Sequence, residues 1–451
     1  MIDTHCHLEM KQFDEDRTAV IDRARASGIE YMITVASDLN GCESAVRLAE
    51  KHDCIFAAVG LHPHDAKDYS NATFERIMEL SRSPKVVAIG EMGLDYYYDH
   101  SAREIQRTVF AEQLAFAKER DLPAIVHSRD AQEDTLRIME NSGVRKGVMH
   151  CFSGDVAMAK RAIALGFHIS LAGPVTFRNA AELREVAQMV PDDLLLIETD
   201  APYLSPEPMR GKRNEPACLV HTAKHIAELR GITIEDLDRL TTLNAQRLFG
   251  IGKLPEAKFT YAIRDSLYLN VTNRCTSACT FCVRFHSDFV KGHNLMLDRE
   301  PTAEELIEEI ADPARYREIV FCGYGEPMLR LDVVKMVASW VKQNGGHVRI
   351  NTNGQGNLIN KRNVLPELHG LVDVVSVSMN AHDAETYERV SRPSFPGAYS
   401  GVIDFIREAK NHIPDVRVTV VTAEGVDVAR CRQIADELGV PLRVRKLDVV
   451  G

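Results

Sequence analysis

Short apolar runs alternate with amphipathic stretches along the first 250 residues or so. The stretch "AREIQRTVFAEQLAFAKER" carries apolar residues three and four positions apart, the period of a helix with one buried face. Eight apolar runs separated by such stretches predict eight parallel strands with helices between them. These strands are expected at Ile2–Thr4, Tyr31–Val35, Ile55–Val59, Val86–Ile89, Ala124–Val126, Gly147–Met149, His168–Ser170 and Leu194–Ile197. Eight strand–helix units of this total length are typical of a closed (β/α)8 TIM barrel.

The pattern changes after residue 250. Gly252 and Pro255 interrupt the helical periodicity, and a second series of strand-like runs begins beyond residue 263. The expected strands are Leu267–Asn270, Ile319–Cys322, Val348–Thr352, Val374–Ser378, Arg417–Val421 and Arg443–Leu447. We therefore predict two α/β domains, at residues 1–252 and 264–451, joined by a linker at residues 253–263.

Composition limits the class of protein and the compartment in which we expect it. The chain has 451 residues, 45% of them hydrophobic, which is ordinary for a globular protein with a sizeable core. No signal peptide is recognisable at the start, no apolar run approaches the ~20 residues of a membrane helix, and ten cysteines are too few for a secreted disulfide scaffold. We expect a cytoplasmic protein without a membrane partner. The net charge of −11 argues against broad nonspecific binding of nucleic acid but leaves room for a local basic patch.

Histidines and carboxylates follow the predicted strands of the first domain, at the end where such barrels carry their active sites. The six candidate metal ligands are His5, His7, Glu91, His127, His150 and Asp200. Imidazole and carboxylate groups are ligands of zinc, manganese or magnesium. A lone histidine beside a strand is usually structural, but six suitable residues at one rim predict a metal centre. His62 follows the third strand and is a candidate substrate contact, although a turn at Pro63 also explains that segment.

Seven motifs of the first half resemble, in order, those of TatD-family metal-dependent hydrolases: "IDTHCHLE", "GLHPHDA", "AIGEMGLDYYYD", "IVHSRDA", "MHCFSG", "ETDAPYLSPEPMRGKRNEPA" and "NAQRLFGI". The resemblance implies a phosphodiesterase of deoxyribonuclease type, acting on DNA or another phosphodiester with two divalent ions (Mg²⁺, Mn²⁺ or Zn²⁺). It also implies catalytic roles for Glu91, which would bridge the ions, and for Asp200, which would help to deprotonate the attacking water.

Basic residues near this rim are candidate phosphate contacts. Arg210, Lys212 and Arg213 lie in "RGKRNEP" after the eighth strand, and Arg178 lies in "GPVTFRN" after the seventh. A solvated charged loop is the alternative for each of them. Because the fold hosts many hydrolytic reactions, an amide or lactone hydrolase remains an alternative function.

Three cysteines, Cys275, Cys279 and Cys282, follow the first strand of the second domain. A closed structural zinc site commonly needs a second Cys-x-x-Cys pair, and none follows downstream. Three thiolates suit a 4Fe-4S cluster with one iron left open. Cys322 is a possible fourth ligand, which would close the site.

The spacing Cys-x-x-x-Cys-x-x-Cys, with Phe281 before the last cysteine, resembles the signature of radical SAM enzymes. The resemblance implies a partial (β/α)6 barrel in which the open iron binds S-adenosylmethionine, whose reductive cleavage gives a radical that attacks a substrate. It also implies an external electron donor and an unknown small-molecule, peptide or nucleotide substrate. The candidate cofactor contacts lie in "FCGYGEP", "RINTNG" and "VSVSMN": Gly323, Tyr324, Gly325, Glu326, Asn351, Asn353, Ser376 and Ser378. A cluster that senses redox state or iron and regulates the hydrolase is the alternative to this fused bifunctional enzyme.

Overall fold

The eight strands expected in the first half form one parallel sheet in the computed structural model of the chain, which describes residues 1–447. They pair in chain order as β1 (Ile2–Cys6), β2 (Tyr31–Val35), β3 (Ile55–Val59), β4 (Val86–Asp95), β5 (Ala124–Arg129), β6 (Gly147–Met149), β7 (Phe167–Leu171) and β8 (Leu195–Ile197). The first and last strands also meet. The Thr4 hydroxyl donates to the Ile197 carbonyl at 3.0 Å, and both the backbone and the side chain of Thr199 donate to the Asp3 carboxylate. The (β/α)8 barrel predicted from the sequence is confirmed.

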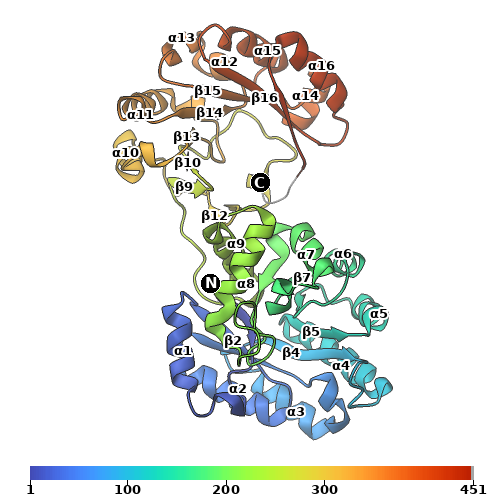
Figure 1. Cartoon of the computed structure of the whole chain (residues 1–451). Coiled ribbons are helices and arrows are strands. Elements are labelled where there is room, and N and C mark those ends of the chain that lie inside the picture. The colour runs from blue at the N-terminus through green and yellow to red at the C-terminus, as the bar shows by residue number, and fades with distance from the viewer. Residues whose placement is uncertain (448–451) are drawn as a thin grey trace. The chain divides into compact units, whose positions relative to one another are not determined.

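Helices follow the strands and lie outside them (Figure 1). They are α1 (Arg17–Ala26), α2 (Leu39–Lys51), α3 (Asn71–Leu80), α4 (Arg103–Arg120), α5 (Gln132–Ser142), α6 (Val156–Ala164), α7 (Ala181–Met189), α8 (Leu219–Arg230) and α9 (Ile234–Phe249). Several begin at a polar cap: the side chains of Asp38, Asp155 and Thr233 accept backbone N–H groups of the first turn of α2, α6 and α9.

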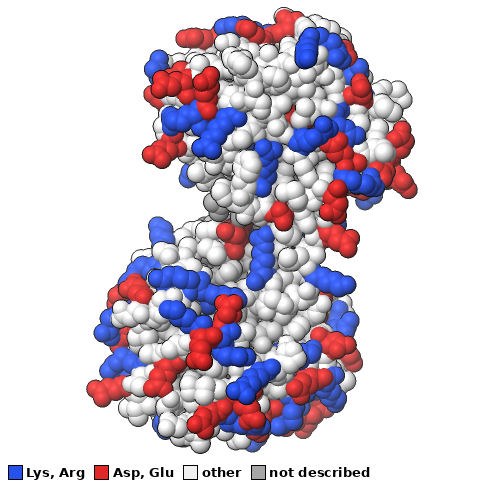
Figure 2. Space-filling model, turned by 180° about the vertical axis from the view of Figure 1, so that it is seen from behind, with Lys and Arg blue, Asp and Glu red and all other residues white. Residues whose placement is uncertain are grey.

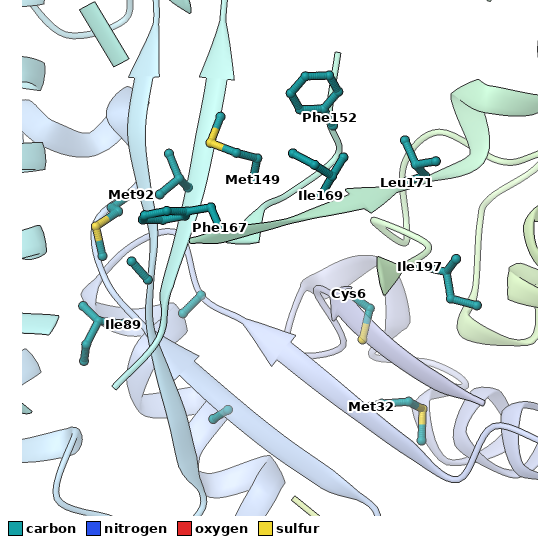
Figure 3. Close-up of a cluster of buried hydrophobic side chains, with 14 of the residues drawn as sticks. Cys6, Met32, Ile89, Met92, Met149, Phe152, Phe167, Ile169, Leu171 and Ile197 are labelled. Atoms are coloured by element: carbon teal, nitrogen blue, oxygen red, sulfur yellow. The ribbon is translucent and has the colours of Figure 1, made fainter. Parts of the chain in front are cut away.

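The strands bury both of their faces. In β2, Met32 belongs to the apolar cluster shared with the surrounding helices, whereas Ile33 and Val35 belong to a second cluster that also holds Leu248 and Phe249 of α9. Successive side chains of a strand point to opposite sides, so an uninterrupted apolar run supplies both layers. Figure 3 shows part of the first cluster, with Met32, Met92 and Met149 among the labelled side chains. This packing fixes the strand ends that carry the site.

The chain divides into two compact units, Met1–Leu254 and a second that begins at Pro255. The second unit has a seven-stranded sheet in the order β17-β16-β15-β14-β13-β10-β9. Six of these strands are parallel and correspond to the six predicted: β10 (Ser266–Leu269), β13 (Glu318–Phe321), β14 (Val348–Thr352), β15 (Val374–Ser378), β16 (Asp415–Val421) and β17 (Leu442–Arg445). This arrangement is the expected partial (β/α)6 barrel. The last four residues of the predicted domain, 448–451, lie outside the described residues.

The linker in the structure is shorter than the predicted linker of residues 253–263. Residues 260–263 form a seventh strand, β9 (Thr260–Ile263), which pairs antiparallel with β10. Tyr261 is buried there and stacks on Tyr268 at a ring distance of 5.2 Å. Four residues are too few for a periodic pattern to be recognised, so tertiary pairing alone makes this segment a strand.

Helices cover one face of the second sheet: α10 (Ala303–Ile310), α11 (Leu331–Gln343), α12 (Gly356–Asn360), α13 (Leu365–Leu368), α14 (Ala384–Ser391), α15 (Ala398–Ala409) and α16 (Val428–Leu438). Ile350, Val375 and Val418 point into the apolar core beneath them. The alternate residues Asn351, Ser376 and Arg417 lie on the opposite face, in register with one another. A hairpin of β11 (Phe289–Val290) and β12 (His293–Asn294) follows the cysteine loop.

The surface carries both charge signs intermixed on the face shown in Figure 2. Within residues 1–447, no helix combines the length and the hydrophobicity needed to cross a bilayer.

Candidate active sites

Six residues from different strands meet at the C-terminal rim of the first barrel. β1 and the residue after it supply His5 and His7, and β4 and β5 supply Glu91 and His127. His150 follows β6 and Asp200 follows β8. The structure therefore brings together the six residues that the sequence analysis proposed as metal ligands.

Glu91 lies at the centre of this group. One of its carboxylate oxygens, Oε2, is 3.3 Å from His5 Nε2 and 4.0 Å from His7 Nε2. The other, Oε1, is 2.9 Å from His127 Nδ1 and 2.7 Å from His150 Nε2. The two oxygens of one carboxylate thus face two different sets of imidazoles. This is the arrangement expected of a carboxylate that bridges two ions.

Metal-ligand atoms come within 4.8 Å of one another in three sets among residues 1–447. These sets are His5–His7–Asp200, His5–His150–Glu198 and His62–Glu91–His127. Both ring nitrogens of His5 are buried without a hydrogen bond, and Nε2 lies 3.3 Å from the Glu91 carboxylate. A buried imidazole without a partner is costly, and a metal ion would satisfy it. The donor sets therefore fit divalent cations of the zinc, manganese or magnesium type.

Outer groups orient the imidazoles. His7 donates from Nδ1 to the Val35 carbonyl at 2.6 Å, which leaves Nε2 directed at Asp200, 3.3 Å away. His127 Nε2 forms a 3.3 Å contact with the carboxylate of Asp95, whereas His150 Nδ1 lies 3.3 Å from that of Glu198 without a hydrogen bond to it. An acceptor on one ring nitrogen holds the proton there and leaves the other nitrogen as a ligand lone pair. Asp95 and Glu198 were not identified from the sequence, although each stands at a strand end beside a predicted ligand.

The carboxylates of this site are held in their charged forms. Burial alone would raise the pKa of Glu91, but the charge of His150 and the hydrogen bonds with His127 and His150 hold it well below its usual range. Burial likewise opposes ionisation of Asp200, and hydrogen bonding and charge from His7 lower its pKa. Two buried, ionised carboxylates are what a cation site requires.

His62 occupies a different position from the six. Its Nδ1 accepts the backbone N–H of His64 at 3.1 Å, so the ring proton is on Nε2, 3.4 Å from Glu91 Oε1. Burial lowers the pKa of His62 to about 4, which keeps the ring neutral at pH 7. In this tautomer His62 is a hydrogen-bond donor toward the six candidate metal ligands, which we call the metal group.

The four basic residues proposed for phosphate binding differ in their surroundings. Arg213 is held by Asp16 at 2.8 Å and by the Gln12 carbonyl at 2.6 Å, which gives it a structural partner. Arg210 stacks on Phe177 at 4.1 Å. Arg178, Arg210 and Lys212 are exposed. These three have their charges available to an anion, whereas Arg213 is already paired.

The three cysteines of the second unit lie in the loop after β10 and are half-buried. The loop is fastened to residues 390–394: Thr280 donates to the Val390 carbonyl and Ala278 to that of Ser391. Burial, and then the neighbouring thiols Cys275 and Cys282, raise the pKa of Cys279 to about 12. Thiols in such a setting ionise readily only against a strong positive centre, which an iron–sulfur cluster or a metal provides.

At least one pair of these thiols lies farther apart than two thiolates bound to one zinc ion would. Four thiolates 2.3 Å from a tetrahedral zinc ion lie about 3.8 Å apart. Within the part of the chain that the structure describes, the three cysteines are not among the ligand sets that come within 4.8 Å. Cys322 is not part of such a set either; its backbone carbonyl accepts the Tyr261 hydroxyl at 2.9 Å.

The glycine-rich segment after β13 packs directly on the cysteine loop. A Cβ at Gly325 would lie 2.2 Å from the Thr272 carbonyl oxygen and 2.4 Å from that of Arg274. A Cβ at Gly323 would lie 2.0 Å from Asn270 Oδ1. Both positions therefore require glycine. Tyr324 between them is buried, and its hydroxyl donates to the Ser287 carbonyl.

The remaining predicted cofactor contacts have distinct partners. The buried Glu326 carboxylate accepts from Met328 N, Thr352 Oγ1 and Asn353 N at 2.7 to 3.1 Å, so its side chain joins two strand ends. Asn353 donates to Thr276 of the cysteine loop at 2.9 Å. Asn351 accepts from Arg349, and Ser376 and Ser378 are half-buried on the helix-free face.

Comparison with known proteins places both units in families. Residues 2–250 match the family model of TatD related DNases, and residues 269–438 match that of the Radical SAM superfamily. A Bacillus subtilis protein described as an uncharacterized metal-dependent hydrolase, YabD, is 47% identical over 254 residues, which are 56% of this chain and 100% of that protein. The 3'-5' ssDNA/RNA exonuclease TatD of Erwinia amylovora is 38% identical over 259 residues, again 56% of this chain and 100% of that protein.

Among solved structures, the TatD homologue YJJV of Escherichia coli has a TM-score of 0.54 at 33% identity, covering 56% of this chain and 98% of that one. Both families consist of enzymes, the first dependent on metal and the second generally on a 4Fe-4S cluster with S-adenosylmethionine. The chain belongs to the TatD related DNase family and carries a Radical SAM superfamily domain in its second unit.

Proposed function

We propose that the first unit hydrolyses phosphodiester bonds of DNA with two divalent ions, Mg²⁺, Mn²⁺ or Zn²⁺. The observation that carries the proposal is the position of Glu91, whose two oxygens face separate imidazole sets. His5, His7 and Asp200 would hold one ion, and His127 and His150 the other, with Glu91 between them. Bound ions would lower the pKa of a water molecule and neutralise the charge that develops on phosphate oxygens.

The protein groups have their own tasks in this reaction. Asp200, ionised and 3.3 Å from His7, would accept the proton of the attacking water. The neutral His62 would donate a hydrogen bond at the same rim, to Glu91 or to a substrate oxygen. Arg178, Arg210 and Lys212 would attract the phosphates of the substrate. The relative from Erwinia amylovora, named as an exonuclease of single-stranded DNA and RNA, supports a nucleic-acid substrate.

Hydrolysis of bis-p-nitrophenyl phosphate by the purified chain tests this assignment. We expect activity that depends on added metal and is removed by a chelator. Asp200→Asn should nearly abolish turnover, because an amide is a poorer metal ligand and cannot take a proton, while thermal unfolding changes little. Chelator-sensitive hydrolysis that survives unchanged in Asp200→Asn would refute the assignment.

We infer for the second unit that Cys275, Cys279 and Cys282 hold a 4Fe-4S cluster and that S-adenosylmethionine binds beside them. Such a cluster supplies the electron for reductive cleavage of S-adenosylmethionine, and an external donor must supply it in turn. The backbone of Gly323–Gly325, together with Asn351, Asn353, Ser376 and Ser378, would bind the cofactor on the helix-free face. Support comes from Asn353, which links β14 to the cysteine loop through Thr276.

Anaerobic purification with iron analysis and an assay for 5′-deoxyadenosine tests the second activity. Ala at any of the three cysteines should remove the cluster absorbance, whereas Cys322→Ala should keep both cluster and cleavage. Loss of the cluster in Cys322→Ala would mean four thiolates and no open iron. A cluster that never yields 5′-deoxyadenosine under reducing conditions would instead favour the sensor function.

A further inference from the structure

Three consecutive tyrosines follow β4 at the rim of the first barrel, and they have different surroundings. Tyr96 is half-buried; its hydroxyl donates to Asp134 at 2.7 Å, and Arg103 lies 4.3 Å above its ring. Tyr97 and Tyr98 are 58% and 49% exposed. Tyr96 thus holds the loop in place, whereas the next two rings face the solvent.

A guanidinium group lies on the two exposed rings. Arg129, the last residue of β5, is 4.2 Å from the ring centre of Tyr97 and 4.8 Å from that of Tyr98. His100 also contacts Tyr98, with ring centres 5.6 Å apart and planes 8° from parallel. Among the described residues, Arg129 has no carboxylate partner. We call Tyr97, Tyr98, His100 and Arg129 the tyrosine platform.

The tyrosine platform is connected to the metal group by a row of ring contacts. Tyr98 contacts His64 edge-on at 5.4 Å, and His64 contacts His62 at 4.3 Å. His62 in turn lies 4.7 Å from His127, one of the residues around Glu91. A chain whose phosphate lies at the metal group would reach the platform with a neighbouring nucleotide, because such proteins contact several nucleotides at once.

The chemistry of the platform matches an unpaired nucleotide. Exposed aromatic faces stack on any base, and an unpaired guanidinium binds the adjoining phosphate or stacks as a planar cation. A base within a duplex is covered on both faces by its neighbours and cannot be reached in this way. A small phosphodiester would lie at the metals without touching the platform.

We propose that the tyrosine platform stacks an unpaired base of a single-stranded polynucleotide near the metal group, and so selects single-stranded substrates. This proposal rests on the function proposed above for the first unit. It adds the residues that distinguish a polynucleotide from a simple phosphodiester.

Binding of a fluorescein-labelled twelve-residue oligo(dT) to the full chain tests the proposal. Anisotropy is measured with Ca²⁺ in place of the catalytic ions, so that the metal group is occupied and the strand is not cut. Tyr97→Ala/Tyr98→Ala should bind at least about fivefold more weakly, since each stacked base contributes that much or more. The matched control, Tyr97→Phe/Tyr98→Phe, keeps both rings and should bind as the wild type does. Equal affinity of the Ala pair and the wild type would overturn the proposal, as would an equal loss in the Phe pair.

A second measurement needs no variant. Single abasic sites are placed in turn along the oligonucleotide, and at one position the wild type should lose about fivefold or more in affinity. The affinity of the Ala pair should not change when the abasic site is placed at that position. Wild-type affinity that is indifferent to every abasic position would overturn the proposal, even if the Ala pair folds poorly.

Hydrolysis of bis-p-nitrophenyl phosphate separates this proposal from the preceding one. The Ala pair should hydrolyse this small substrate at the wild-type rate. If the wild type fails to hydrolyse it with any divalent ion, the proposed hydrolase function fails, while the anisotropy result still decides the platform. If the Ala pair alone loses this activity, the tyrosines act on the metal centre and the platform assignment is wrong.

Discussion

Replacing Asp95 by Asn should impair metal binding more than replacing it by Ala, although Asn is the closer isostere. Oδ1 of Asp95 accepts the backbone N–H groups of Tyr97 and Tyr98 at 3.0 and 2.9 Å. Oδ2 lies 3.0 Å from His64 Nε2 and 3.3 Å from His127 Nε2. The two backbone donors would fix the oxygen of an Asn amide in the Oδ1 position. Its NH₂ group would then face both imidazoles.

The Asp95→Asn substitution would change the tautomer of His127. To accept from the amide, Nε2 must give up its proton, which moves to Nδ1, the nitrogen 2.9 Å from Glu91. That nitrogen then has no lone pair for a metal ion. Loss of such an outer carboxylate typically weakens metal binding about 10- to 100-fold, which is about 1.4–2.7 kcal/mol. Ala removes the acceptor without imposing the wrong tautomer, so its loss should lie at the lower end of this range.

Titration calorimetry with Mn²⁺ on the two variants measures this order. Asp134→Asn is a suitable control, because Asp134 also accepts hydrogen bonds near this rim, from Tyr96 and Arg137, but contacts no histidine. We expect affinities in the order wild type, Asp95→Ala, Asp95→Asn, with the control unchanged. An Asn variant that binds Mn²⁺ as tightly as the wild type, or more tightly than the Ala variant, would refute the reasoning.

Three further predictions follow from the structure. Gly325→Ala should lower both the iron content and the formation of 5′-deoxyadenosine. The added Cβ would meet backbone atoms of Thr272 and Arg274 just before Cys275. Full iron content in this variant would contradict that reasoning. A fragment ending at Leu254 should be soluble and hydrolyse bis-p-nitrophenyl phosphate, since the Bacillus subtilis relative spans only this part of the chain. An insoluble fragment would show that the first unit needs the second unit in order to fold. Burial raises the pKa of Glu326 to about 7 from 4.5, so the unfolding free energy of the second unit should fall as the pH rises from about 4.5 to about 7. Glu326→Gln should remove this slope in urea titrations followed by the fluorescence of Trp340, the one tryptophan, and an unchanged slope would exclude Glu326 as its source.

The strands could be predicted from the sequence because most are short apolar runs buried on both faces. The predicted bounds of β2, β3, β14 and β15 are those of the structure. β4 is longer than predicted, because it continues beyond its apolar part through Glu91 to Asp95. Its pairing with β5 shifts register between Ile89 and Met92. The hairpin β11–β12 has two residues in each strand, too few to produce any period.

The ligand residues could be predicted because parallel strands place their C-terminal ends at one rim. Their outer partners could not. Asp95 and Glu198 are recognisable only from the direction of their side chains toward His127 and His150, which no spacing along the chain specifies. The same holds for Arg213, whose charge suggested phosphate but whose guanidinium is held by Asp16.

The closure of the first barrel by its two terminal strands has a consequence for how the enzyme is made. His5 and His7 leave the ribosome nearly two hundred residues before Asp200, yet they share one ligand set with it. The pairing of Thr4 with Ile197 and of Asp3 with Thr199 must form before that set exists. The ion that Asp200 helps to hold therefore cannot bind before β8 is synthesised, and the nascent chain stays catalytically silent until then. Since domains generally fold in the order of their synthesis, the hydrolase can be complete and loaded while the cysteines of the second unit are still to be translated.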